Sequence, residues 1–108
     1  MRRAICLGVL AGILACGRKP WPEENRRAFV ESCLHSAAQA VGDAARHRDA
    51  ITRYCDCSLQ RMEEKFPLAE VDRLEALVRA SGGRPSAEQT EAVADCAREL
   101  AARVRGVD

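Results

Sequence analysis

The sequence predicts an all-α fold, a small bundle of about four helices crosslinked by two disulfides. Alanine, arginine, glutamate and leucine dominate the composition, while runs of β-branched and aromatic residues typical of strands are absent. Apolar residues recur every three or four positions in segments separated by glycine or proline. The chain begins with an apolar leader that ends at Cys16, and four more cysteines follow it. An even number of cysteines after such a leader is typical of an exported, disulfide-bonded domain.

The leader, residues 1–15, has the pattern of a signal peptide. Arg2 and Arg3 form a basic start, and an apolar run of 12 residues continues from Ala4 to Ala15. A helix that spans a bilayer needs about 20 apolar residues, so this run is too short for a membrane span. We therefore exclude residues 1–15 from the fold and expect an exported chain.

The end of the leader, Ile13-Leu14-Ala15-Cys16, resembles the lipobox of bacterial lipoproteins. The resemblance implies cleavage before Cys16 and acylation of this cysteine, palmitate included, so that the lipid binds the membrane. Three buried acyl chains, at about 0.8 kcal/mol per methylene, would make this attachment permanent. Residues 16–22 then form the lipid anchor and a tether, followed by a helical domain over residues 23–108.

The residues around Cys16 also bear on localisation. Sorting in enterobacterial lipoproteins retains proteins with aspartate after the acylated cysteine at the inner membrane. Gly17 stands there instead, and the resemblance therefore favours the outer membrane, with the domain in the periplasm or at the cell surface. Leu14 departs from the lipobox pattern, in which a small residue is commoner at this position. Ordinary secretion without an anchor, after cleavage near Ala15 or Gly17, is the alternative.

The first helix is predicted from about Glu23 to Val41. Pro22 and the acidic residues after it suit a helix start, and Gly42-Asp43 ends the helix. Trp21, just before this helix, is predicted to fold over the core as a lid, with a membrane-interface anchor as the alternative. The core-facing stripe comprises Phe29, Val30, Cys33, Leu34, Ala37 and Val41.

The second helix is predicted to begin at an Asp49 cap and to run to Phe66, where Pro67 ends it. One face collects its apolar side chains and Cys55, while Cys57 lies on the flank of that face. The members of this stripe are Ile51, Cys55, Ser58, Leu59, Met62 and Phe66.

Two further helices complete the prediction. The third runs from about Leu68 to Ala80 and ends in the loop 81–85. Ser86, followed three residues later by Gln89, forms a capping box for a fourth helix that reaches Val104. Their stripes are Val71, Leu74, Leu77 and Val78 in the third helix, and Val93, Ala97, Leu100, Ala101 and Val104 in the fourth, with Cys96 at its edge.

The four cysteines of the domain define its expected crosslinks. Cys55 and Cys57 lie about 200° apart on one helix, so each must bond to a different element and a bond between the two is disfavoured. If the turn between the first two helices is centred near residue 45, Cys33 and Cys57 are equally distant from it. We therefore favour Cys33–Cys57 with Cys55–Cys96. Cys33–Cys55 with Cys57–Cys96 shifts the register by one residue on each side and stays open.

These residues also resemble a group of small exported bacterial proteins with a Tyr-Cys-x-Cys signature. The resemblance is carried by Phe29-x3-Cys33, Tyr54-Cys55-x-Cys57-x-Leu59, Lys65-Phe66-Pro67 and Cys96. It covers most of the chain after the leader. It implies export and the disulfide scaffold, and it implies nothing about chemistry.

Neither the charge nor the motifs indicate an enzyme or a nucleic-acid-binding protein. Without Arg2 and Arg3 the chain has 15 basic and 16 acidic residues, interspersed, so no basic face suited to nucleic acid is expected. No catalytic constellation, phosphate loop or cofactor motif is visible. We expect no enzymatic activity, cofactor or metal, and a non-catalytic binding or assembly role with an envelope protein as partner.

The alternative is a periplasmic thiol–disulfide or soft-metal protein. Cys55 and Cys57 would form the redox pair, or a copper or zinc site would gather Cys33, His35, Cys55, Cys57 and His47. Asp56 does not favour a thiolate at either neighbour, and zinc ligands normally have two or more residues between them. The structural role of the cysteines is therefore the favoured interpretation.

Overall fold

A computed structural model describes residues 20–106 of the chain and shows the predicted all-α fold with two disulfides. The predicted signal peptide and the predicted lipidation site, Cys16, lie outside the described residues. Five α-helices and one 3₁₀ turn, with no strand, make up this part of the chain. The elements are α1 (Glu23–Val41), α2 (Arg48–Lys65), η2 (Leu68–Glu70), α3 (Val71–Ala80), α4 (Ala87–Ala92) and α5 (Ala94–Val104).

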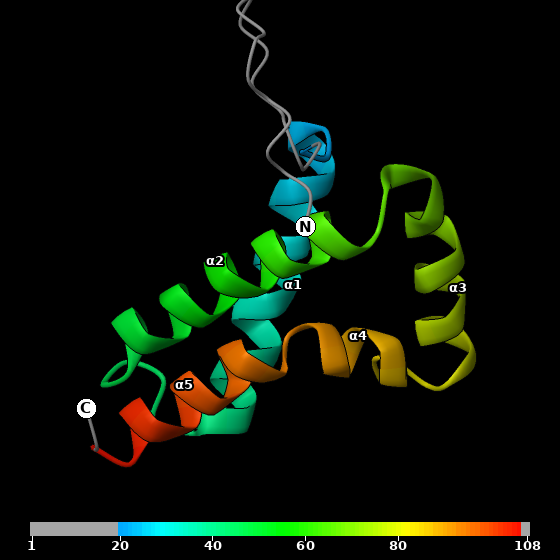
Figure 1. The fold of residues 1–108 in the computed structure, drawn as a ribbon. Helices are drawn as coiled ribbons and strands as arrows, with labels where there is room; N and C mark the ends of the chain where they lie inside the picture. Colours follow the sequence, from blue (N-terminus) through cyan, green and yellow to red (C-terminus); the bar gives the residue numbers. More distant parts are fainter. Residues whose placement is uncertain (1–19, 107–108) are drawn as a thin grey trace, which may run out of the picture.

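Helix α2 occupies the centre of the bundle. Its most extensive contacts are with α1 and with α5, and α5 runs antiparallel to it while α1 crosses behind (Figure 1). The segment of η2, α3 and α4 leaves the end of α2 and returns beneath it to reach α5 (Figure 1). The two cysteines of α2 therefore lie between a preceding and a following helix.

The ends of α1 and α2 follow local sequence signals with one exception. Helix α1 has the predicted bounds and ends at Gly42, whose φ of +91° is accessible to glycine at little cost. Helix α2 ends where Phe66 adopts an extended backbone before Pro67. The predicted Asp49 cap was wrong: His47 is the N-cap, and Asp49 lies in the first turn, where its negative charge still suits the helix dipole.

The last two predicted helices are each divided. The third begins as the 3₁₀ turn η2 before α3, and the fourth breaks at Val93, which has φ −107° and ψ +15°. The capping box is confirmed, because the backbone N–H of Gln89 donates to Ser86 Oγ, while the backbone N–H of Ser86 donates to the side-chain Oε1 of Gln89. The break at Val93 separates α4 from α5, which packs against α2.

The core consists of two clusters along α2. The larger comprises Trp21, Leu59, Met62, Phe66, Val71 and Leu74, and the smaller comprises Ala37, Ile51 and Cys55. Four side chains of the predicted stripes are exposed instead, namely Leu34, Leu77, Ala97 and Ala101. These predictions were wrong because α1 and α5 each pack mainly on α2, which leaves part of each predicted stripe uncovered, while α3 buries only Val71 and Leu74.

Candidate functional site

Trp21 joins the start of the domain to the end of α2. Its side chain is 5% exposed and packs in the larger core cluster. The indole Nε1 donates to the Phe66 carbonyl at 3.0 Å, and the ring meets Phe29 edge-on at 6.0 Å between centroids. The predicted lid is confirmed, and the burial of Trp21 removes the alternative of a membrane-interface anchor.

Glu63 is a buried carboxylate beside this tryptophan. Its side chain has no exposed surface and accepts hydrogen bonds from the Trp21 amide at 2.9 Å and from Arg26 Nε at 2.7 Å. The hydrogen bond to Glu63 raises the pKa of Arg26 above its ordinary value. A buried charge persists only when it is paired and hydrogen-bonded in this way. We call Trp21, Arg26, Glu63 and Phe66 the N-terminal clamp.

Glu63 was not singled out from the sequence. A signal was present, because Glu63 falls four residues after Leu59 and three before Phe66, within the apolar stripe of α2. An acidic residue inside such a stripe requires a cation nearby. Arg26, in the first turns of α1, supplies it.

The disulfides join Cys33 to Cys55 and Cys57 to Cys96, with Cα separations of 5.7 and 5.8 Å. The favoured pairing of Cys33 with Cys57 and of Cys55 with Cys96 was therefore wrong, and the alternative is correct. Cys55 is fully buried in the stripe of α2 that packs on α1, whereas Cys57, on the flank, faces α5. The assumed turn centre near residue 45 was displaced by one residue, which is the whole difference between the two pairings.

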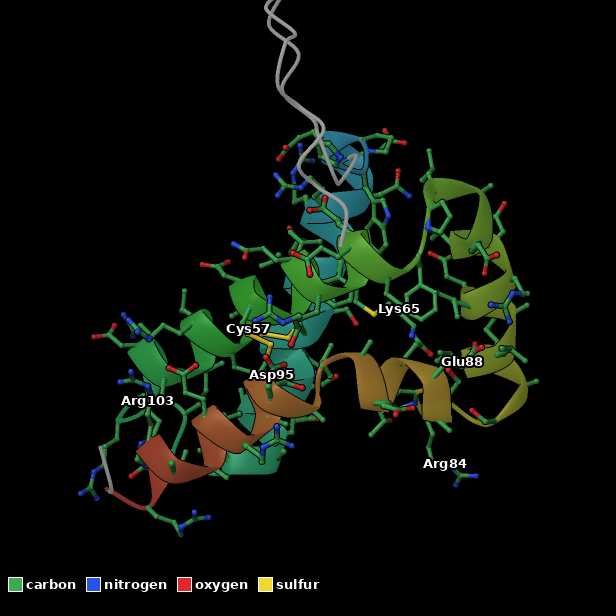
Figure 2. The ribbon with its side chains drawn as sticks, viewed as in Figure 1. Cys57, Lys65, Arg84, Glu88, Asp95 and Arg103 are labelled. Carbon is green, nitrogen blue, oxygen red and sulfur yellow. A yellow bond between two sulfur atoms is a disulfide. The ribbon has the colours of Figure 1, made fainter. Side chains whose placement is uncertain are left out.

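A polar group surrounds the Cys57–Cys96 bridge. A carboxylate oxygen of Asp95 lies within 4.8 Å of both sulfurs, and Figure 2 shows Asp95 beside Cys57 between α2 and α5. Arg61 donates to Asp95 Oδ2 from Nε at 3.2 Å and from Nη2 at 3.0 Å, and the Cys96 amide donates to Oδ1. The hydrogen bond from Arg61 holds the pKa of Asp95 below its ordinary value.

This group is the only cluster of three metal-type donors within residues 20–106. Its two sulfurs are bonded to each other, which leaves Asp95 as the one available ligand. The alternative metal set is not brought together: its cysteines belong to two separate bridges, while His35 is exposed on α1 and His47 precedes α2. The described cysteines therefore crosslink helices in this structure.

An open, shallow hollow of about 360 Å³ lies between α1 and the start of α2. Exposed Leu34 contributes to it together with small alanines and Arg48. The full lining is Leu34, Ala38, Ala44, Ala45, Arg48, Ile51 and Thr52. No titratable pair or nucleophile converges there, so the lining residues supply apolar contact and one positive charge.

Comparisons with known proteins add no family. No family model matches the chain, and neither the curated proteins nor the solved structures give a significant match. No helix within residues 20–106 combines the length and the apolar character that crossing a bilayer requires.

Proposed function

We propose that this protein is a cell-envelope lipoprotein whose disulfide-linked helical domain is a non-catalytic binding or assembly module. The observation that carries the proposal is the placement of the sulfurs: each bridge includes one cysteine that is almost completely buried, Cys55 at 0% and Cys96 at 1% exposure. Each bridge thus joins two helices through a sulfur in the core, and this supports a scaffold. The partner cysteines, Cys33 and Cys57, are half-buried, so the support comes from this crosslinking and not from shielding of the bridges against thiolates.

The size of the core explains why the scaffold uses two bridges. Ring closure across sequence separations of 22 and 39 residues stabilises the fold by roughly 3–4 kcal/mol per bridge in the chain-entropy account. Small domains have a net stability of about 5–15 kcal/mol. The core here contains few large side chains, and the two bridges together supply a large share of the total.

The binding role is tested by photo-crosslinking in intact cells. A photoreactive amino acid replaces in turn Leu34, Leu68 and Leu77, the large apolar side chains that are exposed within residues 20–106. We expect at least one position to give the same envelope-protein adduct in repeated experiments. A position on the solvated face of α3, Asp72, serves as the control. Repeated failure of all three leucine positions to give an adduct would contradict the proposal.

The anchor is tested separately by fractionation. The lipobox resemblance predicts that the wild-type chain floats with membranes and that the Cys16→Ser variant does not. Mass spectrometry of the N-terminal peptide should show three acyl chains on Cys16 in the wild-type protein. Unchanged membrane association of the Cys16→Ser variant would eliminate the lipid anchor.

A thiol–disulfide or soft-metal function is the second candidate, because Asp95 and Arg61 place charged groups beside the Cys57–Cys96 bridge. Intact-mass measurement without reductant, combined with thiol titration and metal analysis, separates the two functions. Two bridges that resist titration in the purified protein support the scaffold. Rapid reduction at low dithiol concentration, or bound copper or zinc, supports the second candidate.

A further inference from the structure

The N-terminal clamp fixes the point at which the chain enters the domain. The backbone and the indole of Trp21 are both hydrogen-bonded to the end of α2. Between Cys16 and Trp21 the chain has five residue steps, which can span at most roughly 18 Å when extended. The longest dimension of the domain is 47 Å. A lipid on Cys16 would therefore keep the clamp, and the part of the domain around it, near the headgroups.

One exposed apolar turn lies at this end of the domain. Leu68, 47% exposed, follows two residues after Phe66, whose carbonyl accepts the Trp21 indole. In Figure 1 the start of α1 and the turn that leads into α3 lie on the same side of the molecule, and α3 runs away from that side. Leu34 lies in the middle of α1, and Leu77, 42% exposed, lies in the last turns of α3.

The turn is apolar and held firmly. Pro67, Leu68 and Ala69 are three consecutive exposed apolar residues. Phe66, buried at 4% exposure, anchors the turn on one side, and Val71 anchors it on the other. The proline fixes its own φ, here −63°. The exposed side chains therefore project from a rigid support, which lowers the entropy cost of inserting them into an interface.

We propose that residues 67–69 form the surface with which the anchored domain contacts the phospholipid bilayer, with Leu68 at the level of the headgroups. This inference rests on the lipid anchor of the proposed function. Exposed side chains at this end carry both signs, Glu23, Glu24 and Glu64 beside Arg27 and Lys65, so no basic patch draws the turn to anionic lipid. The pair of Arg26 with Glu63 adds no net charge.

Tryptophan at two matched positions tests the contact. The lipidated variants Leu68→Trp and Leu77→Trp are reconstituted separately into phosphatidylcholine vesicles that carry bromine high on the acyl chains. The native Trp21 is buried and gives the same background in both variants. We expect brominated lipid to quench the added fluorescence of Leu68→Trp, with a blue-shifted emission, and to leave that of Leu77→Trp at the level without bromine. Leu77 lies roughly 15 Å further along the 3₁₀ and α-helical rise.

Flotation of the same samples separates the inference from the anchor on which it rests. Flotation with equal quenching at both positions, or with none, would overturn the contact and leave the anchor standing. A wild-type chain that does not float would overturn the proposed anchor and, with it, the contact. Adding Cys16→Ser to Leu68→Trp should abolish the quenching. If that doubly substituted protein is still quenched, the contact does not depend on the tether and the inference is wrong.

Discussion

Glu63 shows how one charged residue can fix the entry of a chain into a small domain. Its carboxylate is removed from solvent, and hydrogen bonds from the Trp21 amide and the Arg26 guanidinium offset the loss of hydration. Trp21 in turn adds apolar area to the core. Removal of the carboxylate would leave the donors of Arg26 and Trp21 with a weaker acceptor in a partly dry site.

The Glu63→Gln variant should lose about 2–3 kcal/mol of unfolding free energy, because the volume is kept while charge-assisted hydrogen bonds are lost. Urea unfolding of the domain with both disulfides intact measures the loss. Glu64→Gln, one residue further on and exposed, is the matched control and should change stability by less than about 0.5 kcal/mol. Equal effects of the two variants would contradict the clamp.

The Asp95 carboxylate should contribute stability in a defined pH range. Because Arg61 lowers the pKa of Asp95 in the folded state, the contribution is present above the unfolded value of about 3.9 and is lost as pH falls through the folded pKa. The wild-type protein should therefore have a higher melting temperature than Asp95→Asn at pH 6, and this gap in melting temperature should close on acidification toward pH 2. Thermal melts across this range measure it.

Salt provides the control for the pH dependence. The Arg61–Asp95 pair is exposed, so 1 M sodium chloride should shrink the gap at pH 6. A gap that widens as pH falls would contradict the assignment of Arg61 as the partner that lowers the pKa.

At the scale of the elements, the sequence predicts those helix ends that depend on local chemistry. Gly42 ends α1, Pro67 ends α2, and the Ser86 box begins α4, all as expected. The break at Val93 was not predictable, since no glycine or proline marks it and the apolar pattern continues through it. The path of the chain at Val93 is set by the packing of α5 along α2 and by the bond from Cys96 to Cys57, and not by local helix propensity.

The capping box should control the local stability of α4. Ser86→Ala removes the acceptor for the Gln89 amide at a cost of about 1 kcal/mol, which corresponds to about fivefold faster local opening. Hydrogen exchange at Thr90 and Val93, whose amides donate to the Ser86 and Gln89 carbonyls, measures the change. Ser36→Ala, on the exposed surface of α1, is the control and should leave these rates unaltered. Exchange unaffected by Ser86→Ala would contradict the role of the box.

At the scale of the whole molecule, two rings meet on α2. The Cys33–Cys55 ring closes the α1–α2 hairpin, and the Cys57–Cys96 ring encloses η2, α3 and α4. That α2 carries both crosslinks follows from the opposite directions of Cys55 and Cys57. The pairing does not follow from the sequence, because moving the centre of the α1–α2 turn by one residue exchanges one pairing for the other. The position of Cys55 in the apolar stripe of α2 indicates its bond with α1 better than the assumed centre of the turn does.

Removal of each bridge should loosen a different half of the domain. Cys57→Ala with Cys96→Ala should speed hydrogen exchange in α3, α4 and α5 while the α1–α2 hairpin stays protected. Cys33→Ala with Cys55→Ala should act mainly on α1. Each double substitution should lower the free energy of unfolding by roughly 3–4 kcal/mol. A loss below about 1 kcal/mol for both would contradict the importance of the crosslinks to this small core.

A disulfide map of the protein, purified without reductant, tests the architecture most directly. Trypsin leaves Cys55 and Cys57 in one peptide, but a protease that cleaves before aspartate separates them at Asp56. The structure predicts that the peptide containing Cys33 is bonded to peptide 49–55, and that peptide 56–71 is bonded to the peptide beginning at residue 95. Four free thiols, or peptide 49–55 bonded to the peptide that contains Cys96, would contradict it.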